Sequence, residues 1–509
     1  PTGYYWLNAP SPSVRINLLD SDDAVTIAPG ENFTVQYEAI PVIYPQMSAN
    51  FYRIGVDENG NGSLVRYSYA GQSGQIESYF HAVGNMPTGP LVTAVEAAFA
   101  SSDYLLVTNL YRLQSGASNA NQIPGLLMDM ARLARDAEGV IALPTNLATA
   151  VDIDDLLEPN GFWYESLHPN FRQTLGGYVL FVGEEEIIPV QSGGWGVDYS
   201  DLRYASTGGA ARPELVLGRI TGDNVANLRK PIQAAASFHR TGAFFDGSHA
   251  LIWSGRSDGE GTFWSNVKGM DSRLSDRGTA VTRFRGKDYS NETDLLTALQ
   301  QNSTGRDWII YRGHGYRYGF ADVGGYAVRT DTVNTLNLNA RPVVLALACT
   351  TGDYRQNSDG DNSIGEAFLA NGAAVFVGSI ETSSRDRNSS ASRAYFNRWH
   401  DGRPVGEILA DIMRDTWGDS SWWWPDSMTW ERWAYDYHTF GDPKYGMGVA
   451  PPKSSAEGDE TTAVSLFFND TAAATINVNL PDLEIIPLDE GWHEVILPEG
   501  NQLALRDDY

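Results

Sequence analysis

The sequence predicts an α/β protein with a mostly parallel sheet that is covered by helices on both faces. Strand-like and helix-like segments alternate from Tyr104 onward, a pattern typical of βαβ units. Several strand candidates are short continuous apolar runs, such as 308–311 and 342–348. Such runs are typical of strands buried on both faces of a parallel sheet. The alternation occurs twice, over 104–238 and 249–377, so we expect two similar α/β halves.

The first half is predicted from apolar runs for strands and from apolar residues at helical spacing for helices. Its elements are strand 104–107, helix 123–137, strands 139–143, 178–182 and 214–220, and helix 224–238. The second half begins with an apolar strand, and its helix at 291–301 starts with Ser290 or Asn291 as an N-cap. Its elements are strand 249–254, helix 263–277, strand 280–284, helix 291–301, the strands 308–311 and 342–348, helix 363–370 and strand 373–377, followed by a mainly helical, Trp-rich stretch at 389–436.

We expect β-rich regions on both sides of the α/β part. Ser13–Leu18 and Phe33–Tyr37 alternate apolar and polar residues at period two. Residues 464–509 alternate similarly after a Pro- and Ser-rich linker at 451–463, which predicts a small immunoglobulin-like β domain. The predicted domains are a β-rich region at 1–95, the first α/β half at 96–240, the second half with the candidate catalytic residues at 241–450, and the β domain at 451–509.

Composition excludes several classes of function. The chain has 509 residues and a net charge of −27, so no basic surface is available for nucleic acid or for an anionic membrane. No segment reaches the ~18–20 apolar residues that span a bilayer. One cysteine rules out an intramolecular disulfide. We expect an exported or cell-surface monomer in saline surroundings, with any leader peptide already removed.

Two of the apolar runs end in a reactive side chain. Trp308–Tyr311 leads into Arg312-Gly313-His314, and 342–348 leads into Cys349. Ligands of open α/β sheets bind beyond the carboxyl ends of the strands, so an imidazole and a thiol there are candidates for a base and a nucleophile. The alternative is that Cys349 is a small buried hydrophobe, as most free cysteines are. Its position at a strand end and the Gly-His-Gly context favour catalysis.

These residues resemble the His-Gly…Ala-Cys pattern of the caspase-like cysteine peptidases of clan CD. The closer resemblance is to the gingipains, peptidase family C25, and it extends over roughly residues 100–448. The segments that carry it are Gly313–Gly315, Cys349–Asp353, Ser363–Phe368, Ala374–Ser379, Tyr178–Gly183, Ile187 with Pro189, Ser200–Tyr204, Glu214–Ile220 and His438–Pro443. The resemblance implies a secreted cysteine endopeptidase that acts on proteins or peptides and requires no cofactor.

The resemblance also implies roles for individual residues. Cys349 would attack as a thiolate, and His314 would take its proton and later protonate the leaving amine. Backbone N–H groups of Gly315 and Cys349 would hold the oxyanion. An acidic residue orients the imidazole in gingipains, but Arg256 falls at that position here. Asp258 or Glu260 in the same loop could replace it, and a backbone carbonyl is a further alternative.

Three departures from the gingipain pattern bear on specificity. Phe263 stands where arginine-specific gingipains place the Asp of the S1 pocket. Arg312 replaces a small residue, and Arg385 replaces a Trp. Because a guanidinium suits a carboxylate, we predict cleavage after Glu or Asp. The alternative is that these arginines are solvated or paired with Asp386 and Asp353.

Other functions stay open at this point. They are a gingipain-like preference for Arg or Lys at P1, a transpeptidase or self-processing maturation enzyme, and a surface binding protein without catalysis. Two oxygen-rich loops raise the question of calcium. We read Asp57–Gly62 as a hairpin turn, since Ser68 stands where a calcium loop needs Glu. Asp359 and Asp361 are the candidate ligands of a structural Ca²⁺.

Overall fold

The structure is a computed structural model that divides the chain into two units, one of Pro1–Ser101 with Pro452–Tyr509 and the other of Ser102–Pro451. In the first unit it describes only strands. In the second unit it describes residues 102–109, 112–113, 122–144, 148–158, 177–207, 212–222, 224–241, 245, 247–257, 261–322, 325–355, 363–400, 402–418 and 429–446.

Strands from the two ends of the chain pair with each other in the first unit. β24 (Thr462–Leu466) pairs antiparallel with β4 (Phe33–Glu38), and β26 (Leu503–Leu505) pairs antiparallel with β2 (Val14–Leu18). The immunoglobulin-like fold of 451–509 stays a prediction. The other described strands here are β1 (Thr2–Tyr4), β3 (Ala24–Ile27), β5 (Val42–Tyr44), β6 (Asn50–Val56), β7 (Asn61–Ser68), β8 (Ile76–His81) and β25 (Val495–Leu497).

A mostly parallel sheet forms the centre of the second unit. Its strands lie in the order β16-β15-β17-β21-β22-β23-β14-β11-β9-β10. Most are completely buried, which explains their continuous apolar sequences. Their bounds are β9 Tyr104–Val107, β10 Gly139–Ala142, β11 Tyr178–Val182, β14 Val216–Ile220, β15 His249–Ser254, β16 Ala280–Arg285, β17 Trp308–Arg312, β21 Val343–Leu347, β22 Val375–Ser379 and β23 Tyr437–Gly441.

One strand, β23, joins the two halves into a single sheet. It runs antiparallel to β22 and parallel to β14, with Phe440 opposite both Phe376 and Arg219. Asp442, just past its end, accepts hydrogen bonds from Tyr104 Oη and His239 Nε2, both at 2.7 Å. This segment belongs to the family resemblance, and the sequence predicts no secondary structure for it, because it shows neither an apolar run nor a clear alternation.

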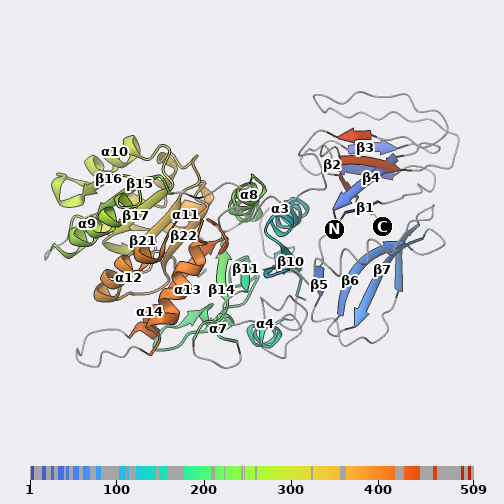
Figure 1. Cartoon of the computed structure of the whole chain (residues 1–509), viewed down its shortest axis with the longest axis horizontal. Coiled ribbons are helices and arrows are strands. Elements are labelled where there is room, and N and C mark those ends of the chain that lie inside the picture. The colour runs from blue at the N-terminus through green and yellow to red at the C-terminus, as the bar shows by residue number, and fades with distance from the viewer. Residues whose placement is uncertain are drawn as a thin grey trace. The chain divides into compact units, whose positions relative to one another are not determined.

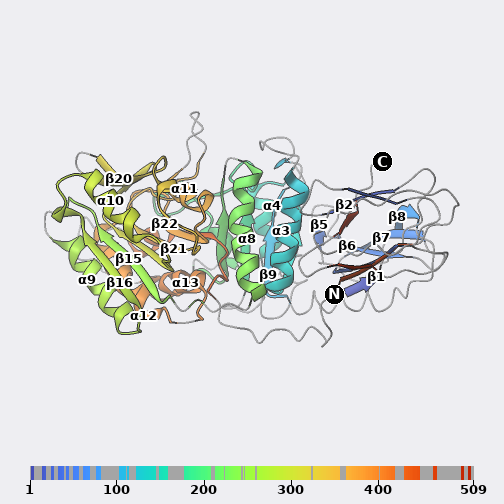
Figure 2. The ribbon, with the colours of Figure 1, turned by 90° about the horizontal axis from the view of Figure 1, so that it is seen from above.

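Helices cover the sheet, which confirms the predicted fold class (Figure 1). α3 and α8 lie side by side, and α8 also contacts α11 (Figure 2). α9, α12 and α13 form a second packed row. The helices are α3 Ile123–Asp136, α4 Ala150–Leu157, α7 Leu202–Ala205, α8 Val225–Thr241, α9 Thr262–Ser275, α10 Glu292–Asn302, α11 Ile364–Ala370, α12 Arg385–Arg398, α13 Val405–Thr416 and α14 Trp430–Asp436, with 3-10 turns η4 Gly286–Asp288 and η5 Val333–Thr335.

Side-chain caps fix where several helices begin. Asn291 accepts from the backbone of Asp294, as the sequence predicts for α10. Ser363 and Glu366 form a capping box at the start of α11. None of the helices in the described ranges is long and apolar enough to cross a membrane.

Two small sheets lie outside the central one. β18 (His314–Tyr316), β19 (Gly319–Asp322) and β20 (Gly325–Arg329) form an antiparallel sheet directly after β17, in a segment for which the sequence predicts no element. Tyr311 of β17 stacks on Phe320 of β19, with ring centroids 4.3 Å apart, so this sheet is fixed to the core. β12 (Gln191–Ser192) pairs with β13 (Tyr199–Ser200).

Candidate active site

The candidate base and nucleophile lie just past the ends of two neighbouring strands. β17 and β21 are parallel, and their last paired residues are Arg312 and Leu347. His314 and Cys349 each follow two residues later, at the same carboxyl edge of the sheet. His314 is exposed and Cys349 is half-buried.

The backbones that carry these two side chains touch at Gly315. A Cβ atom at this position would lie 2.6 Å from the carbonyl oxygen of Cys349 and 2.6 Å from Thr351 Cγ2. Thr350 Oγ1 lies 3.5 Å from the carbonyl oxygen of Gly315. Only glycine permits this approach, so the structure gives a physical reason for the Gly-His-Gly sequence.

The imidazole of His314 is positioned by packing. The ring of Phe263 meets it edge to face, with centroids 5.2 Å apart. Tyr311 Oη donates to the carbonyl oxygen of His314 at 2.6 Å. Within the ranges that the structure describes, no side chain forms a hydrogen bond with the imidazole. The candidates Asp258 and Glu260 lie outside the described residues.

Arg256 has partners other than the imidazole. Its Nη1 pairs with Glu292 Oε1 at 2.8 Å, and its Nη2 donates to the carbonyl oxygen of Ser290 at 2.8 Å. Arg256 therefore fixes the loop after β15 to the start of α10. Its position in the sequence also makes Arg256 a candidate substrate-binding residue, and that role stays a prediction.

The thiol of Cys349 faces a residue that the sequence analysis does not single out. Cys349 Sγ lies 3.6 Å from the carbonyl oxygen of Ser383 and 3.8 Å from its hydroxyl oxygen. Ser383 lies in the segment between β22 and α12. The residue after the cysteine, Thr350, has a φ of 49° and donates its N–H to the carbonyl oxygen of Glu381 at 2.8 Å. This left-handed conformation is unfavourable for a β-branched residue, and it persists because neighbouring segments hold it.

Arg312 is buried, and none of the described carboxylates pairs with it. It is 1% exposed, and burial lowers the pKa of its guanidinium to about 10. Its hydrogen-bond acceptors are Asn266 Oδ1 at 2.9 Å, the carbonyl oxygens of Leu347 at 3.0 Å and Arg385 at 2.9 Å, and Ser389 Oγ at 3.3 Å. From its position in the sequence, Arg312 is predicted to contact the substrate, whereas the structure places its guanidinium inside the wall of the site.

Phe263 lies between two guanidinium groups. Its ring centroid is 4.5 Å from Cζ of Arg312 and 5.3 Å from Cζ of Arg385, which are cation–π distances. Arg385 is half-buried, and its Nη2 donates to Thr262 Oγ1 at 2.9 Å. The suggested partner Asp353 instead accepts from Tyr199 Oη and from Arg355.

An open hollow lies beside these arginines, between the first turns of α9 and α12. Its volume is about 480 Å³. Two of its lining residues, Asn266 and Ser389, are the side chains that bind Arg312. The lining residues are Gly261, Thr262, Ser265, Asn266, Asp386, Ser389, Ser390 and Arg393.

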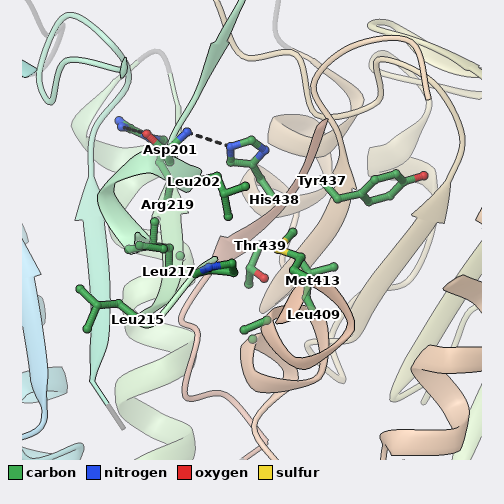
Figure 3. A pocket seen from close by; sticks show the side chains of 15 residues that line it. Asp201, Leu202, Leu215, Leu217, Arg219, Leu409, Met413, Tyr437, His438 and Thr439 are labelled. Atoms are coloured by element: carbon green, nitrogen blue, oxygen red, sulfur yellow. Dashed lines mark hydrogen bonds and ion pairs between the residues drawn. The ribbon is translucent and has the colours of Figure 1, made fainter. Parts of the chain in front are cut away.

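A second histidine, His438 on β23, lies in a buried polar cluster with a structural role. Its Nε2 accepts from the backbone N–H of Asp201 at 3.1 Å (Figure 3), and burial lowers the pKa of its imidazole. Asp201 forms a two-bond ion pair with Arg219 at 2.6 and 2.7 Å. The cluster borders a mainly apolar cavity of about 30 Å³ between β14, β23 and α13. It ties β14 to β23 and is closed to a polypeptide.

The calcium prediction concerns Asp359 and Asp361, which lie outside the described residues. Among the described residues, no group of three or more His, Cys, Asp or Glu side chains is arranged to hold a metal ion.

Comparisons with known proteins agree with this geometry. The family described as peptidase family C25 matches residues 168–447. One similar structure is that of the Arg-specific cysteine proteinase gingipain R (RgpB), with 17% sequence identity and a TM-score of 0.50. The match covers 68% of this chain and 78% of the gingipain chain. A structure described as a protease is 14% identical over the same shares, with a TM-score of 0.52.

A third structure, the complex of the pro- and mature domains of Porphyromonas gingivalis RgpB, is 17% identical. It covers 67% of this chain and 79% of its own, with a TM-score of 0.50. At these identities the likenesses show a shared fold. No curated protein sequence matches the chain.

Proposed function

Because the chain belongs to peptidase family C25 and is a cysteine peptidase, we propose that Cys349 is its nucleophile, that His314 is its general base and acid, and that it cleaves after acidic residues. The observation that carries the catalytic part is the contact between the two strand ends. Gly315 lies against the carbonyl oxygen of Cys349, so the segments that bear the imidazole and the thiol meet at one edge of the sheet.

The reaction then follows from the two side chains. His314 takes the proton of the Cys349 thiol, and the sulfur attacks the carbonyl carbon of the scissile bond. The C–N bond breaks as the imidazolium returns that proton to the leaving amine, which leaves a thioester on Cys349. His314 next removes a proton from water, the hydroxide displaces the sulfur, and the carboxylic acid leaves. The exposure of His314 suits both proton transfers, because water and substrate reach it.

The proposal of an acidic P1 residue rests on the charge around Phe263. The described part of the chain has three buried arginines, and two of them have an aspartate partner: Arg219 pairs with Asp201 at 2.6 Å and Arg414 with Asp411 at 3.2 Å. The acceptors of Arg312 within the described ranges are all neutral. A buried cation without a counter-charge is unfavourable, and an anion that enters the site would compensate it.

The hollow offers a place for that anion. Asn266 and Ser389 line it and bond to Arg312, so the Arg312 charge lies one layer behind its wall. α9 and α12 both begin at the hollow, and a helix N-terminus favours negative charge. Arg385, at the first turn of α12, is close enough to Thr262 at the rim to bond with it at 2.9 Å. The lining itself carries one acid, Asp386, and one base, Arg393, so the added charges of Arg312 and Arg385 favour a Glu or Asp side chain over a Lys or Arg side chain.

A panel of fluorogenic peptides that differ only at P1 tests the proposal. Glu and Gln have nearly the same shape, so their comparison isolates the charge. We expect kcat/KM to be higher for Glu by about 10- to 100-fold, the range for a hydrogen bond to a charged group. Cys349→Ala should cleave none of the peptides. A preference for Arg or Lys would exclude the acidic pocket and leave the peptidase intact.

A pair of variants then connects the preference to the hollow. Arg385→Gln should lower kcat/KM for the Glu peptide and leave the Gln peptide nearly unchanged. Arg277→Gln is the matched control, since Arg277 is exposed and its guanidinium donates to the carbonyl oxygen of Arg273. An equal loss for both peptides in Arg385→Gln would mean that Arg385 supports the fold and does not select the substrate.

A further inference from the structure

We propose that the hydroxyl group of Ser383 stabilises the thiolate of Cys349 by donating its hydrogen to Sγ. The inference rests on the proposed role of Cys349 as the nucleophile and adds a second residue to its activation. Ser383 Oγ lies 3.8 Å from Cys349 Sγ, within reach of a hydrogen bond to sulfur. A thiolate is a better hydrogen-bond acceptor than a thiol, so this contact favours the reactive, charged form of the sulfur.

A chain of buried side chains fixes the direction of this hydrogen bond. Trp433 Nε1 donates to Asn388 Oδ1 at 2.9 Å, and Asn388 Nδ2 donates to Ser383 Oγ at 2.9 Å. The indole N–H is only a donor, so Asn388 must present its oxygen to Trp433 and its NH₂ group to Ser383. The Ser383 oxygen therefore accepts from Asn388, and its own hydrogen is left for Cys349 Sγ or for the Tyr437 oxygen; of these two acceptors, the thiolate carries the charge and is the stronger.

The members of this chain are also held in place. Ser383 is 7% exposed, and Asn388 and Trp433 are each 1% exposed, so water does not compete for their bonds. Trp433 stacks on Tyr437, with ring centroids 4.5 Å apart. These side chains come from the segment before α12, from α12 itself and from α14, three elements that pack together at the nucleophile.

The two contacts of Ser383 have opposite effects on the thiol. The thiol can donate to the carbonyl oxygen of Ser383 at 3.6 Å, and this bond exists only while the sulfur keeps its proton. The hydroxyl contact favours the thiolate. If the hydroxyl group is removed, the carbonyl group remains and favours the protonated, unreactive form. Ser383→Ala is therefore expected to shift the equilibrium of Cys349 from the thiolate toward the protonated thiol.

The rate of labelling of Cys349 by iodoacetamide as a function of pH tests this inference. The thiolate displaces iodide and forms a sulfur–carbon bond, so the rate follows the thiolate fraction. The full chain has one cysteine, which makes the signal specific. In Ser383→Ala we expect the midpoint to rise by roughly one pH unit, with equal rates in both proteins well above it. Peptidase kcat/KM below the midpoint should fall about tenfold.

Two further variants separate this role from a structural one. Asn388→Asp accepts from both Trp433 and Ser383, so it turns the Ser383 hydrogen away from sulfur and should raise the midpoint as well. If Ser383→Ala does not fold, an unchanged midpoint in Asn388→Asp overturns the inference alone, because the lost hydrogen bond and the repulsion between the new carboxylate and the thiolate both act to raise it. Ser392→Ala is the matched control: Ser392 is completely buried on the same helix and donates to the carbonyl oxygen of Ser389 at 2.8 Å. Its midpoint should equal that of the wild type.

The Tyr437 hydroxyl group also interacts with Ser383, so Tyr437→Phe belongs in the series. We expect its midpoint to stay within a few tenths of the wild-type value. A shift in Tyr437→Phe with none in Ser383→Ala would overturn the inference, and so would superimposable profiles for the wild type and Ser383→Ala. A loss of rate that is equal at every pH would indicate a packing role and would also overturn it. Failure of the proposed function looks different: the wild type itself would then neither hydrolyse peptides nor be labelled at neutral pH.

Discussion

Asp436→Asn is expected to stabilise the protein at neutral pH. Asp436 is completely buried at the end of α14, and among the described residues neither of its carboxyl oxygens has a hydrogen-bond partner. Burial, opposed by Arg432 and assisted by Glu381, raises the pKa of this carboxyl group to about 8. Asparagine has the same shape and cannot ionise. Burying the asparagine amide without hydrogen bonds costs about as much free energy as burying the neutral carboxyl group of Asp436. The two side chains therefore differ mainly in whether they can ionise.

The sign and size of the effect follow from proton linkage. Between the unfolded-state pKa of about 3.9 and the folded-state pKa, the unfolded chain loses this proton and the folded chain keeps it. Stability therefore falls by up to about 1.4 kcal/mol per pH unit as the pH rises through this window. The asparagine variant lacks this term. The free energy of unfolding of the variant should exceed that of the wild type by nearly zero at pH 4 and by about 4 kcal/mol at pH 7, and the difference should level off above pH 8.

Thermal unfolding of both proteins from pH 4 to pH 9 measures this difference. The gap between their melting temperatures should widen steadily up to about pH 8. Asp331→Asn is the control, because Asp331 has an exposed side chain that pairs with Arg329. A gap that does not change with pH would refute the reasoning, since it would mean that Asp436 ionises normally in the folded protein.

Three further predictions concern close contacts and buried charges. Gly315→Ala should reduce peptide hydrolysis at least 100-fold and destabilise the protein by about 1–3 kcal/mol, because the new Cβ meets the Cys349 carbonyl oxygen; activity assays and thermal unfolding measure both effects. Asp201→Ala leaves Arg219 charged and buried, so urea unfolding should show a loss of about 3–5 kcal/mol. Arg312→Met removes a buried charge that has no counter-charge, so urea unfolding should show no loss of stability, whereas cleavage after Glu should fall about tenfold or more.

The sequence was sufficient for those parts of the fold that depend on local patterns. Apolar runs locate β17 and β21, and the rule that ligands bind at the carboxyl ends of strands then selects His314 and Cys349. β23 has no comparable signal. Its pairing partners lie on β22 and β14, far away in sequence, and its segment mixes Tyr, His and Thr. Such a strand is specified by its neighbours in the fold and not by its own periodicity.

The surroundings of the candidate site were harder to predict for the same reason. Arg312 reads as a charge near the substrate, but no pattern shows that its side chain turns inward toward Asn266. The contact between Ser383 and Cys349 joins positions 34 residues apart, on segments that follow two different strands. A lone serine in a polar segment is among the least informative sequence features. Only the fold brings it to the sulfur.

The position of β23 also determines when a growing chain can complete its sheet. β14 of the first half and β22 of the second are both synthesised before Phe440. In the described sheet these two strands are joined through β23, which carries Phe440. Until β23 is made, β14 and β22 each lack a pairing partner on one side. The hydrogen bond between Tyr104 and Asp442 likewise joins residues that are 338 positions apart in the sequence. Assembly is therefore postponed until synthesis of the α/β unit is nearly finished, and slow folding is expected of pairings that span such distances along the chain. For a protein able to cut other polypeptides, we expect that delay to keep copies inactive until synthesis is nearly complete.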